Sequence, residues 1–248
     1  MKKRGGGYAI FRSSWYDSPE KATWVMFLAS TFSSAHKHGD DLSFLIFHKG
    51  DLFTEAGPRN YNYKDEMTAY SYSGFAHNVL CVDDKDFPAR IGKNGFRGVT
   101  KQALRTRITD FSLEGSIKKV TGSQECFPGI VQSRTIEYDK GRKHVIIRDN
   151  LEANRKFKAS LLFHVAEGVE VRHSDNGGLC FLRDKELIAT MTTACQSPVN
   201  VKVLTGEGEG AYRTWIFNGK TEPVSSTLVI LEVKCGKMTR IDTFVKLH

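Results

Sequence analysis

Histidines, tyrosines and carboxylates gather in one part of the sequence, between residues 33 and 84. Four of the eight histidines lie there, His36, His38, His48 and His77, and the first two form a His-x-His pair. Because side chains alternate along an extended chain, this pair presents both imidazoles on one side. Together with Glu55 and His77 it can hold a divalent cation, and zinc suits such nitrogen and oxygen ligands best. Ordinary surface or core histidines remain the alternative.

Four tyrosines accompany these histidines in a segment rich in Gly, Pro and Asn: Tyr61, Tyr63, Tyr70 and Tyr72. Strands are commonly rich in tyrosine, so tyrosine alone indicates no function. Position in a loop beside histidines is more suggestive, because loops carry binding and catalytic residues more often than regular elements do.

Positive charge is concentrated just after this segment. Six Lys or Arg and no Asp or Glu occur from residue 89 to 107, namely Arg90, Lys93, Arg97, Lys101, Arg105 and Arg107. The whole chain has 36 Lys and Arg against 28 Asp and Glu, a net charge of +8. Such a surface favours an anionic polymer, with a merely solvated basic face as the alternative. Nucleic acid is disfavoured, because only Phe96 is interleaved and no nucleic-acid-binding module is present.

The elements that must position these residues are predicted to be strands. Short apolar or alternating runs recur along the chain, as in residues 8–12, 24–28 and 227–233, with Gly, Asn and Asp turns between them. Residues 134–138 and 144–148 flank a turn and predict a hairpin. Helical patterns are few and short, at residues 19–22 and 99–108. We therefore expect an all-β fold, a large antiparallel β-sandwich with few short helices, as a single domain over residues 1–248.

Cysteines and apolar runs bound the remaining possibilities. The five cysteines are scattered and form no Cys-x-x-Cys pair, which favours free thiols. No run of 18 apolar residues occurs, so no membrane span is expected. The basic start is followed by three glycines and a run containing Arg12, which is not the apolar segment of a signal peptide. Localisation is therefore left open by the sequence.

Several motifs follow one another along the chain: Arg12-Ser-Ser-Trp15, His36-x-His38-x-Asp40 with Leu42-Ser-Phe44, Glu55-Ala-Gly57 with Tyr61, Ala76-His77-Asn78-Val79, and a later Ile147-Arg-Asp149 with Leu161-Leu-Phe-His164. They cover most of the chain, and the specific ones lie in its first 80 residues. Through these motifs the chain resembles the C-terminal β-domain of the heparinase II/III-like polysaccharide lyases, which include oligoalginate lyases.

The resemblance implies a zinc ion held by His38, Glu55 and His77, with His36 facing the substrate and Tyr61 or Tyr63 lining the cleft. It implies β-elimination at a uronic acid of an acidic polysaccharide, of the alginate or glycosaminoglycan type, and work in the periplasm or outside the cell. Tyr and His can exchange protons in such a reaction. The candidate substrate contacts are Asn78, Arg59, Arg90, Lys93 and Arg97.

The sequence also departs from the family pattern. Glu55 stands where Asp is usual, and Tyr72-Ser-Gly74-Phe replaces an Arg-Ser-Thr that would bring an arginine to the cleft. The helical toroid that precedes the β-domain in such lyases is not among these residues, so activity is expected to need a toroid partner, on the same or a separate chain. A non-catalytic, capsule-related or acidic-glycan-binding module that keeps the metal site is the alternative. A cupin is disfavoured, because Leu42 stands where a cupin needs Glu.

Overall fold

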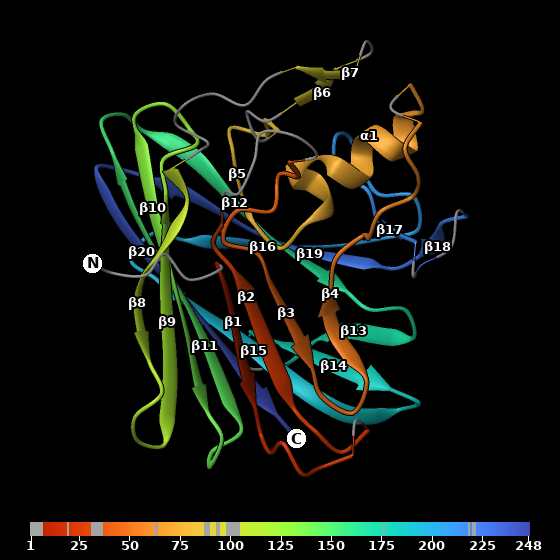
Figure 1. The fold of residues 1–248 in the computed structure, drawn as a ribbon, viewed down its shortest axis with the longest axis vertical. Coiled ribbons are helices and arrows are strands. Elements are labelled where there is room, and N and C mark those ends of the chain that lie inside the picture. The colour runs from red at the N-terminus through yellow and green to blue at the C-terminus, as the bar shows by residue number, and fades with distance from the viewer. Residues whose placement is uncertain are drawn as a thin grey trace.

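Antiparallel strands form two large sheets in the computed structural model, which describes residues 7–18, 20–30, 37–62, 64–86, 90–92, 95–97, 105–175, 177–217, 219 and 222–248 (Figure 1). For residues 90–92 and 95–97 the description covers the backbone alone.

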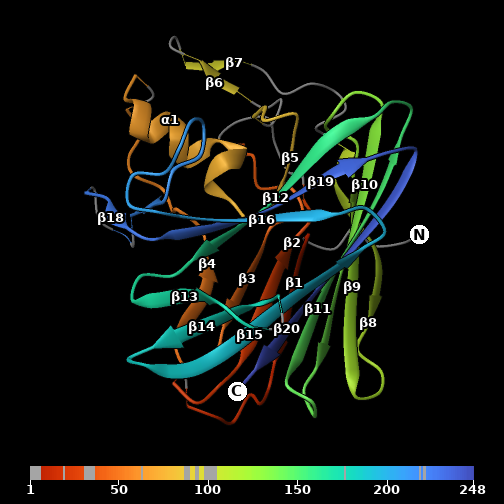
Figure 2. The ribbon, with the colours of Figure 1, turned by 180° about the vertical axis from the view of Figure 1, so that it is seen from behind.

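The first sheet has the order β1 (Tyr8–Arg12), β2 (Trp24–Leu28), β3 (Phe44–Phe47), β4 (Asp51–Thr54), β12 (Phe157–Val165), β19 (Thr227–Cys235), β16 (Val199–Thr205), and β5 (Leu80–Val82) also pairs with β12. The second sheet has the order β13 (Val169–His173), β14 (Leu179–Arg183), β15 (Glu186–Cys195), β20 (Met238–Leu247), β11 (His144–Ala153), β10 (Ile130–Asp139), β9 (Ile117–Gln124), β8 (Arg107–Ser112). The two sheets face each other as a sandwich, seen from behind in Figure 2. The predicted all-β sandwich is confirmed.

The remaining described elements are short and lie at one end of the sandwich (Figure 1). They are α1 (Glu66–Tyr72), the 3-10 turn η1 (Gly74–Ala76), and two small hairpins, β6 (Arg90–Gly92) with β7 (Gly95–Arg97) and β17 (Trp215–Ile216) with β18 (Val224–Ser225). No described helix is long and apolar enough to cross a membrane.

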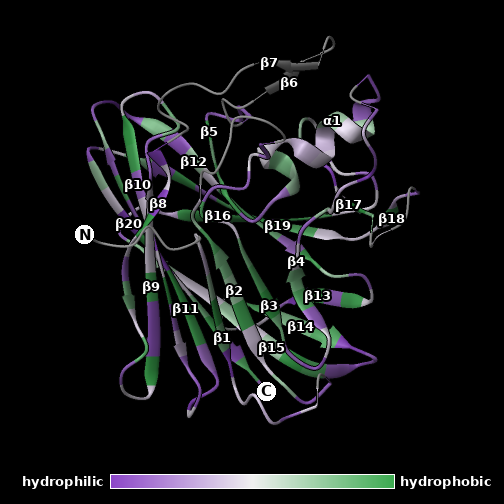
Figure 3. Cartoon of the chain, in the orientation of Figure 1, coloured by the Kyte–Doolittle hydropathy of each residue, from purple (hydrophilic) through white to green (hydrophobic). Residues whose placement is uncertain are grey.

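Alternating side chains build the core between the sheets. In β11, for example, Val145, Ile147, Asp149 and Leu151 point inward and are fully buried, while Ile146, Arg148 and Asn150 between them are partly exposed. Four phenylalanines from both sheets meet edge to face in the centre: Phe44, Phe53, Phe163 and Phe181. Figure 3 shows the hydrophobic colour along much of β2 and β3 and more hydrophilic colour at the loops. One apolar core therefore joins the two sheets.

The central strand β12 is buried along nearly its whole length, because its outer face is covered as well. There, Leu162 packs with Cys81 and with Tyr212 from the loop that leads to β17. Phe75 of η1 packs against the same cluster. This cover places α1, η1 and the loops around them over one end of the first sheet, where the histidine-rich segment lies.

The two expected helices are tested only in part. At the first, Glu20 and Lys21 form a turn and no helix is assigned, and Pro19 lies outside the described residues. Of residues 99–108, the part up to residue 104 also lies outside them, and Arg107 and Ile108 begin strand β8. The described α-helix is α1, which starts at the capping residue Asp65, whose carboxylate accepts a hydrogen bond from the Met67 backbone N–H at 2.8 Å.

Candidate functional site

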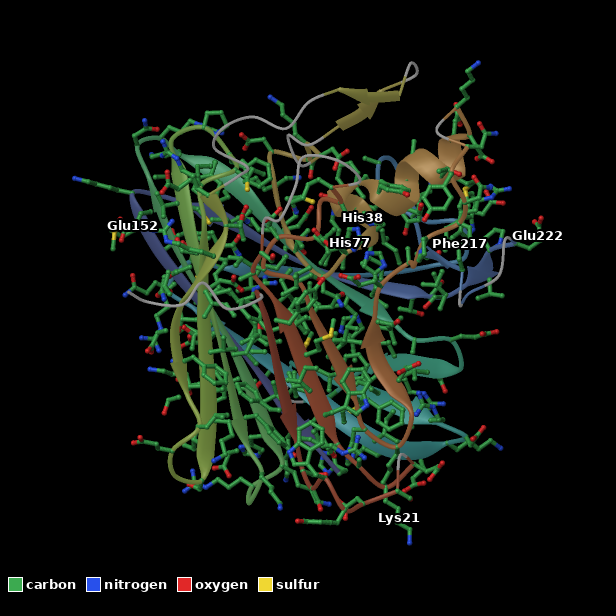
Figure 4. The ribbon with its side chains drawn as sticks, viewed as in Figure 1. Lys21, His38, His77, Glu152, Phe217 and Glu222 are labelled. Atoms are coloured by element: carbon green, nitrogen blue, oxygen red, sulfur yellow. The ribbon has the colours of Figure 1, made fainter. Side chains whose placement is uncertain are left out.

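Three chain segments converge at the end of the first sheet: the turn before β3, the residues after β4, and the residues between η1 and β5. They carry His38, Glu55 and His77 respectively. Figure 4 shows His38 and His77 beside each other under α1. The grouping expected from the sequence resemblance is thus present, although the segments are distant along the chain.

Lys37 shapes the first of these segments. Its ammonium is almost completely buried, and Nζ donates to the His38 carbonyl at 2.8 Å and contacts the Asp40 and Asp41 carboxylates at 2.8 and 2.6 Å. The turn ends at Leu42, which has a φ of +63°, a conformation that residues other than glycine rarely adopt. A compact, charge-filled turn therefore carries His38.

His77 and Glu55 form the centre of the site. His77 is buried, and its Nδ1 lies 3.0 Å from Glu55 Oε1. Ser43 Oγ donates to the same carboxylate oxygen at 2.5 Å. The His38 ring lies 5.4 Å from the His77 ring and 4.0 Å from the Tyr72 ring, centroid to centroid. The site is thus two imidazoles and one carboxylate, backed by an aromatic ring.

The pKa values of the two histidines are shifted in opposite directions. Burial, reinforced by the positive charge of His77, lowers the pKa of His38 to about 4, so that its ring is neutral at pH 7. Burial alone would lower the pKa of His77 as well, but the adjoining carboxylate of Glu55 outweighs it and raises that pKa. Burial opposes ionisation of Glu55, yet the charge and hydrogen bond of His77 lower the pKa of Glu55 overall. These shifts favour the charged forms of His77 and Glu55 and disfavour the charged form of His38.

The donor set fits a zinc ion in kind. Nitrogen from two imidazoles and oxygen from one carboxylate are usual zinc ligands. The Nε2 atom of His77 is buried and has no hydrogen-bond partner among the described residues, which is costly unless some group outside the chain satisfies it. As the side chains now stand, no three His, Cys, Asp or Glu among the described residues are arranged to hold a metal ion. Zinc binding therefore stays a prediction.

The other predicted site residues are more scattered. His36, Tyr63 and Lys93 lie outside the described residues. Tyr61 is 76% exposed in the loop that leads to α1. Arg59 is half-buried in the same loop, and its Nη1 lies 3.3 Å from the capping carboxylate of Asp65.

Two of the predicted substrate contacts share a hairpin. Arg90 of β6 and Arg97 of β7 are opposite each other in its register. The β6–β7 hairpin lies above α1, at the same end of the molecule as the histidines (Figure 1). The basic stretch therefore begins near the site, while its arginines' contacts stay a prediction.

Asn78 has a supporting position. It is fully buried, its amide nitrogen donates to the Phe44 and Thr54 carbonyls, both at 2.7 Å, and its amide oxygen accepts from the His164 backbone N–H at 2.6 Å. These bonds fasten the segment after His77 to three strands of the first sheet. The substrate contact that the sequence suggested would require breaking one of them.

The sequence motifs include Ser43 and Asp149, but they assigned no role in the site to Ser43 or to the buried ion pair of Arg134 and Asp149, which lies beneath the site. Arg134 and Asp149 occupy inward positions of β10 and β11, where apolar residues are expected, and they face each other directly in the register. In the sequence, two opposite charges at positions where alternation predicts buried apolar residues could have indicated this pair.

Comparison with known proteins agrees with this architecture. The family model described as Heparinase II/III-like, C-terminal, matches residues 3–242. No curated protein matches the chain. Among solved structures, the heparan sulfate lyase HepC from Pedobacter heparinus superposes with a TM-score of 0.78 at 12% identity, and a heparinase III gene product superposes with 0.74 at 19%.

The superposition is nearly complete for this chain but partial for those proteins. It covers 98% of this chain and 35% of each of the two relatives, so the chain spans about a third of their length. At these identities the likeness shows the fold, and the family rests on the sequence match. The resemblance inferred from the motifs is confirmed: the chain belongs to the Heparinase II/III-like, C-terminal family.

Proposed function

We propose that the chain is the β-domain of a polysaccharide lyase that cleaves a uronic-acid-containing acidic polysaccharide by β-elimination, and that it holds zinc through His38, Glu55 and His77. The observation that carries the proposal is the proximity of these three side chains, with Glu55 at His77 Nδ1 and the His38 ring beside the His77 ring, together with a buried His77 Nε2 that has no hydrogen-bond partner among the described residues. Membership in the heparinase II/III-like family supports the polysaccharide, and one of the solved relatives is a heparan sulfate lyase.

The proposed reaction requires two proton transfers. A base takes the proton from the carbon next to the uronate carboxylate. The bond from the neighbouring carbon to the leaving sugar oxygen then breaks, a carbon–carbon double bond forms, and an acid protonates the leaving oxygen. Tyr61, Tyr63 and His36 are the candidates for these transfers, because tyrosine and histidine can both give and take protons. A bound zinc ion would supply positive charge that shapes the site.

Substrate binding is assigned to cationic residues of the loop after β4 and of the basic stretch. Arg59 lies on the same loop as Tyr61, Arg90 and Arg97 belong to the β6–β7 hairpin, and Lys93, outside the described residues, belongs to the basic stretch by sequence. A cationic cleft draws in an anionic polymer and neutralises its carboxylates. Since the chain spans about a third of the lyases that it resembles, we propose that a helical toroid, on the same or a separate chain, supplies the other wall of the cleft.

Metal analysis tests the zinc site. We expect the purified chain to hold one zinc ion, and His77→Gln and Glu55→Gln each to lose it while the far-ultraviolet circular dichroism stays unchanged. The control is His173→Gln, which changes an exposed histidine of β13. Wild-type protein that takes up no zinc at stoichiometric level would contradict the site.

Enzyme assays test the lyase. Heparan sulfate and alginate are incubated with the chain, with and without a toroid domain from a full-length relative, and the unsaturated product is followed by its ultraviolet absorbance. We expect Tyr61→Phe to lower the rate by about 100-fold if Tyr61 transfers a proton. Absence of product under both conditions would overturn the lyase.

A second candidate function is an acidic-glycan-binding module that keeps the metal site and does not cleave. The net charge of +8 favours it, because a basic surface can bind an anionic polymer without any chemical step. Retained binding of heparan sulfate or alginate, together with no unsaturated product in the presence of the toroid domain, would identify such a binding module.

A further inference from the structure

One arginine joins the second sheet to the site on the first. Arg134 of β10 is completely buried, and its Nη1 donates to two backbone carbonyls, Leu42 at 2.8 Å and Asn78 at 2.6 Å. These carbonyls are 36 positions apart in the sequence. Leu42 immediately precedes Ser43, and Asn78 immediately follows His77. A single guanidinium therefore fixes the separation of the two segments that meet at the site.

Arg134 is itself held rigidly from behind. Its Nε and Nη2 donate to the two carboxylate oxygens of Asp149 at 2.9 and 3.1 Å, a bidentate pair in which neither side chain is exposed. Gln132 Nε2 donates to Asp149 at 2.6 Å, and Gln124 Nε2 donates in turn to Gln132. Two parallel hydrogen bonds give such a pair a fixed geometry, which lysine cannot reproduce.

The segments that Arg134 joins also contact each other through Ser43. Ser43 Oγ donates to Glu55 at 2.5 Å and accepts from the Asn78 backbone N–H at 3.2 Å. The position of Ser43 depends on Leu42, whose φ of +63° is unfavourable for a side chain with a Cβ and is stabilised by the bond from Arg134. Arg134 is thus linked to the Glu55–His77 pair by two hydrogen bonds, one from Arg134 to the Leu42 carbonyl and one from the adjacent Ser43 to Glu55.

We propose that Arg134, backed by Asp149, is a positioning residue that sets the distance and orientation of Glu55 and His77 by binding the Leu42 and Asn78 carbonyls. It touches neither substrate nor metal. The expected effect of Arg134 on zinc binding rests on the proposed function. The effect of Arg134 on the positions of Glu55 and His77 does not, and it can be measured without any metal.

The test uses two variants of the full chain and one matched control. Arg134→Met with Asp149→Leu removes both charges and keeps apolar volume, which avoids leaving one buried charge unpaired. Arg134→Lys keeps the charge beside Asp149 but loses the planar fork. The control is Glu137→Leu with Arg148→Met, an ion pair of 2.7 Å on the outer face of the same strands, β10 and β11.

Two measurements follow for each protein that folds by circular dichroism. The first is the affinity for Zn²⁺ alone, which we expect to fall about 10–100-fold in both Arg134 variants, as for other residues that orient metal ligands, and to stay within about twofold in the control. The second is the ¹⁵N signal of the His77 imidazole in metal-free protein at one fixed pH. We expect it to move in the Arg134 variants and to stay in place in the control.

The outcomes separate the two proposals. If wild-type protein binds no Zn²⁺, the proposed zinc site fails, and the His77 signal alone decides the positioning role. A folded Arg134 variant with a wild-type His77 signal and wild-type Zn²⁺ affinity overturns the inference. If the double variant does not fold, Arg134→Lys decides in the same way.

Discussion

His164 connects the site to the centre of the first sheet. Its side chain is fully buried in β12, and its Nε2 lies 2.9 Å from the Phe75 carbonyl of η1, to which it donates when neutral. Burial, reinforced by the positive charge of His77, lowers the pKa of His164 to about 4. The ring is therefore neutral in the folded protein over a pH range in which an unfolded histidine takes up a proton.

This difference predicts a loss of stability in mild acid. Between pH 6.5 and about 4 the unfolded chain binds the proton at residue 164 and the folded chain does not, so the free energy of unfolding falls as pH falls. The full effect of this one group is about 3 kcal/mol. Urea unfolding at a series of pH values measures it, and His164→Gln, whose amide can still donate to Phe75, should reduce the slope.

Another histidine provides the control for that slope. His173→Gln changes an exposed ring on β13 and should leave the difference between pH 7 and pH 5 unchanged. If the free energy of unfolding of His164→Gln depends on pH as strongly as that of the wild type, other groups cause the acid sensitivity. His38 and His48 are then the candidates, because their pKa values are also lowered.

At the level of residues, the sequence predicted the central side chains of the site but not the residues that hold them in place. His38, Glu55 and His77 were assigned from motifs, and they do lie together. Ser43 and Arg134 were missed, because their role arises from contacts with residues that are distant along the chain, such as the 92 positions between Leu42 and Arg134. Period-two alternation predicts that position 134 faces the core, but it does not predict what a charged side chain meets there.

Strand β9 approaches the first sheet closely at Gly122. A Cβ added there would lie 2.7 Å from Ala29 Cβ, 2.7 Å from Leu42 Cδ2 and 2.8 Å from Phe27 Cζ. We expect Gly122→Ala to lower the free energy of unfolding by about 1–3 kcal/mol, because the sheets must separate or the side chains must leave their preferred rotamers. Urea unfolding measures the change.

Gly236 offers the matching control for that substitution. It lies between β19 and β20, and an added Cβ would meet no atom within 4 Å. Gly236→Ala should change the free energy of unfolding by less than about 1 kcal/mol. If Gly122→Ala has the same free energy of unfolding as the wild type, the two sheets can accommodate the added methyl group without loss of stability, and the prediction is wrong.

Elements with strict alternation could be predicted, and those fixed by tertiary contacts could not. The hairpin expected from residues 134–148 is present as β10 and β11. Helix α1 was missed, since its residues Glu66–Tyr72 show no apolar stripe and were taken for a tyrosine-rich loop. Its stability comes from the Asp65 cap and from Tyr70, whose hydroxyl donates to the Arg213 and Trp215 carbonyls at 3.2 Å. The cap was visible in the sequence, but the tyrosine contacts were not.

The molecule as a whole is predicted to unfold in one step. The single-domain assignment to residues 1–248 stays a prediction, but the core supports it, because one apolar cluster contains residues of both sheets. Breaking either sheet exposes the apolar face of the other, so neither is stable alone. Far-ultraviolet and near-ultraviolet circular dichroism should give coincident urea transitions. Two separated transitions would indicate two independent units.

The net charge of +8 predicts a salt-dependent affinity for the proposed acidic polysaccharide. Attraction between exposed charges is screened by salt, with a Debye length of about 10 Å at 0.1 M. We therefore expect binding to heparan sulfate, measured by calorimetry, to weaken about tenfold or more between 0.05 and 0.3 M NaCl. Uncharged dextran should not bind at either concentration.

The location of the contact can be separated from the net charge. Replacing Arg90, Lys93 and Arg97 by Gln removes three positive charges from the basic stretch, and replacing Lys140, Arg142 and Lys143 by Gln removes three from the turn between β10 and β11, which lies at the far end of the sandwich (Figure 1). If the basic stretch binds the polymer, the first protein should lose far more affinity at 0.05 M NaCl than the second. Equal losses would mean that net charge alone drives binding and that residues 90–97 have no special part in it.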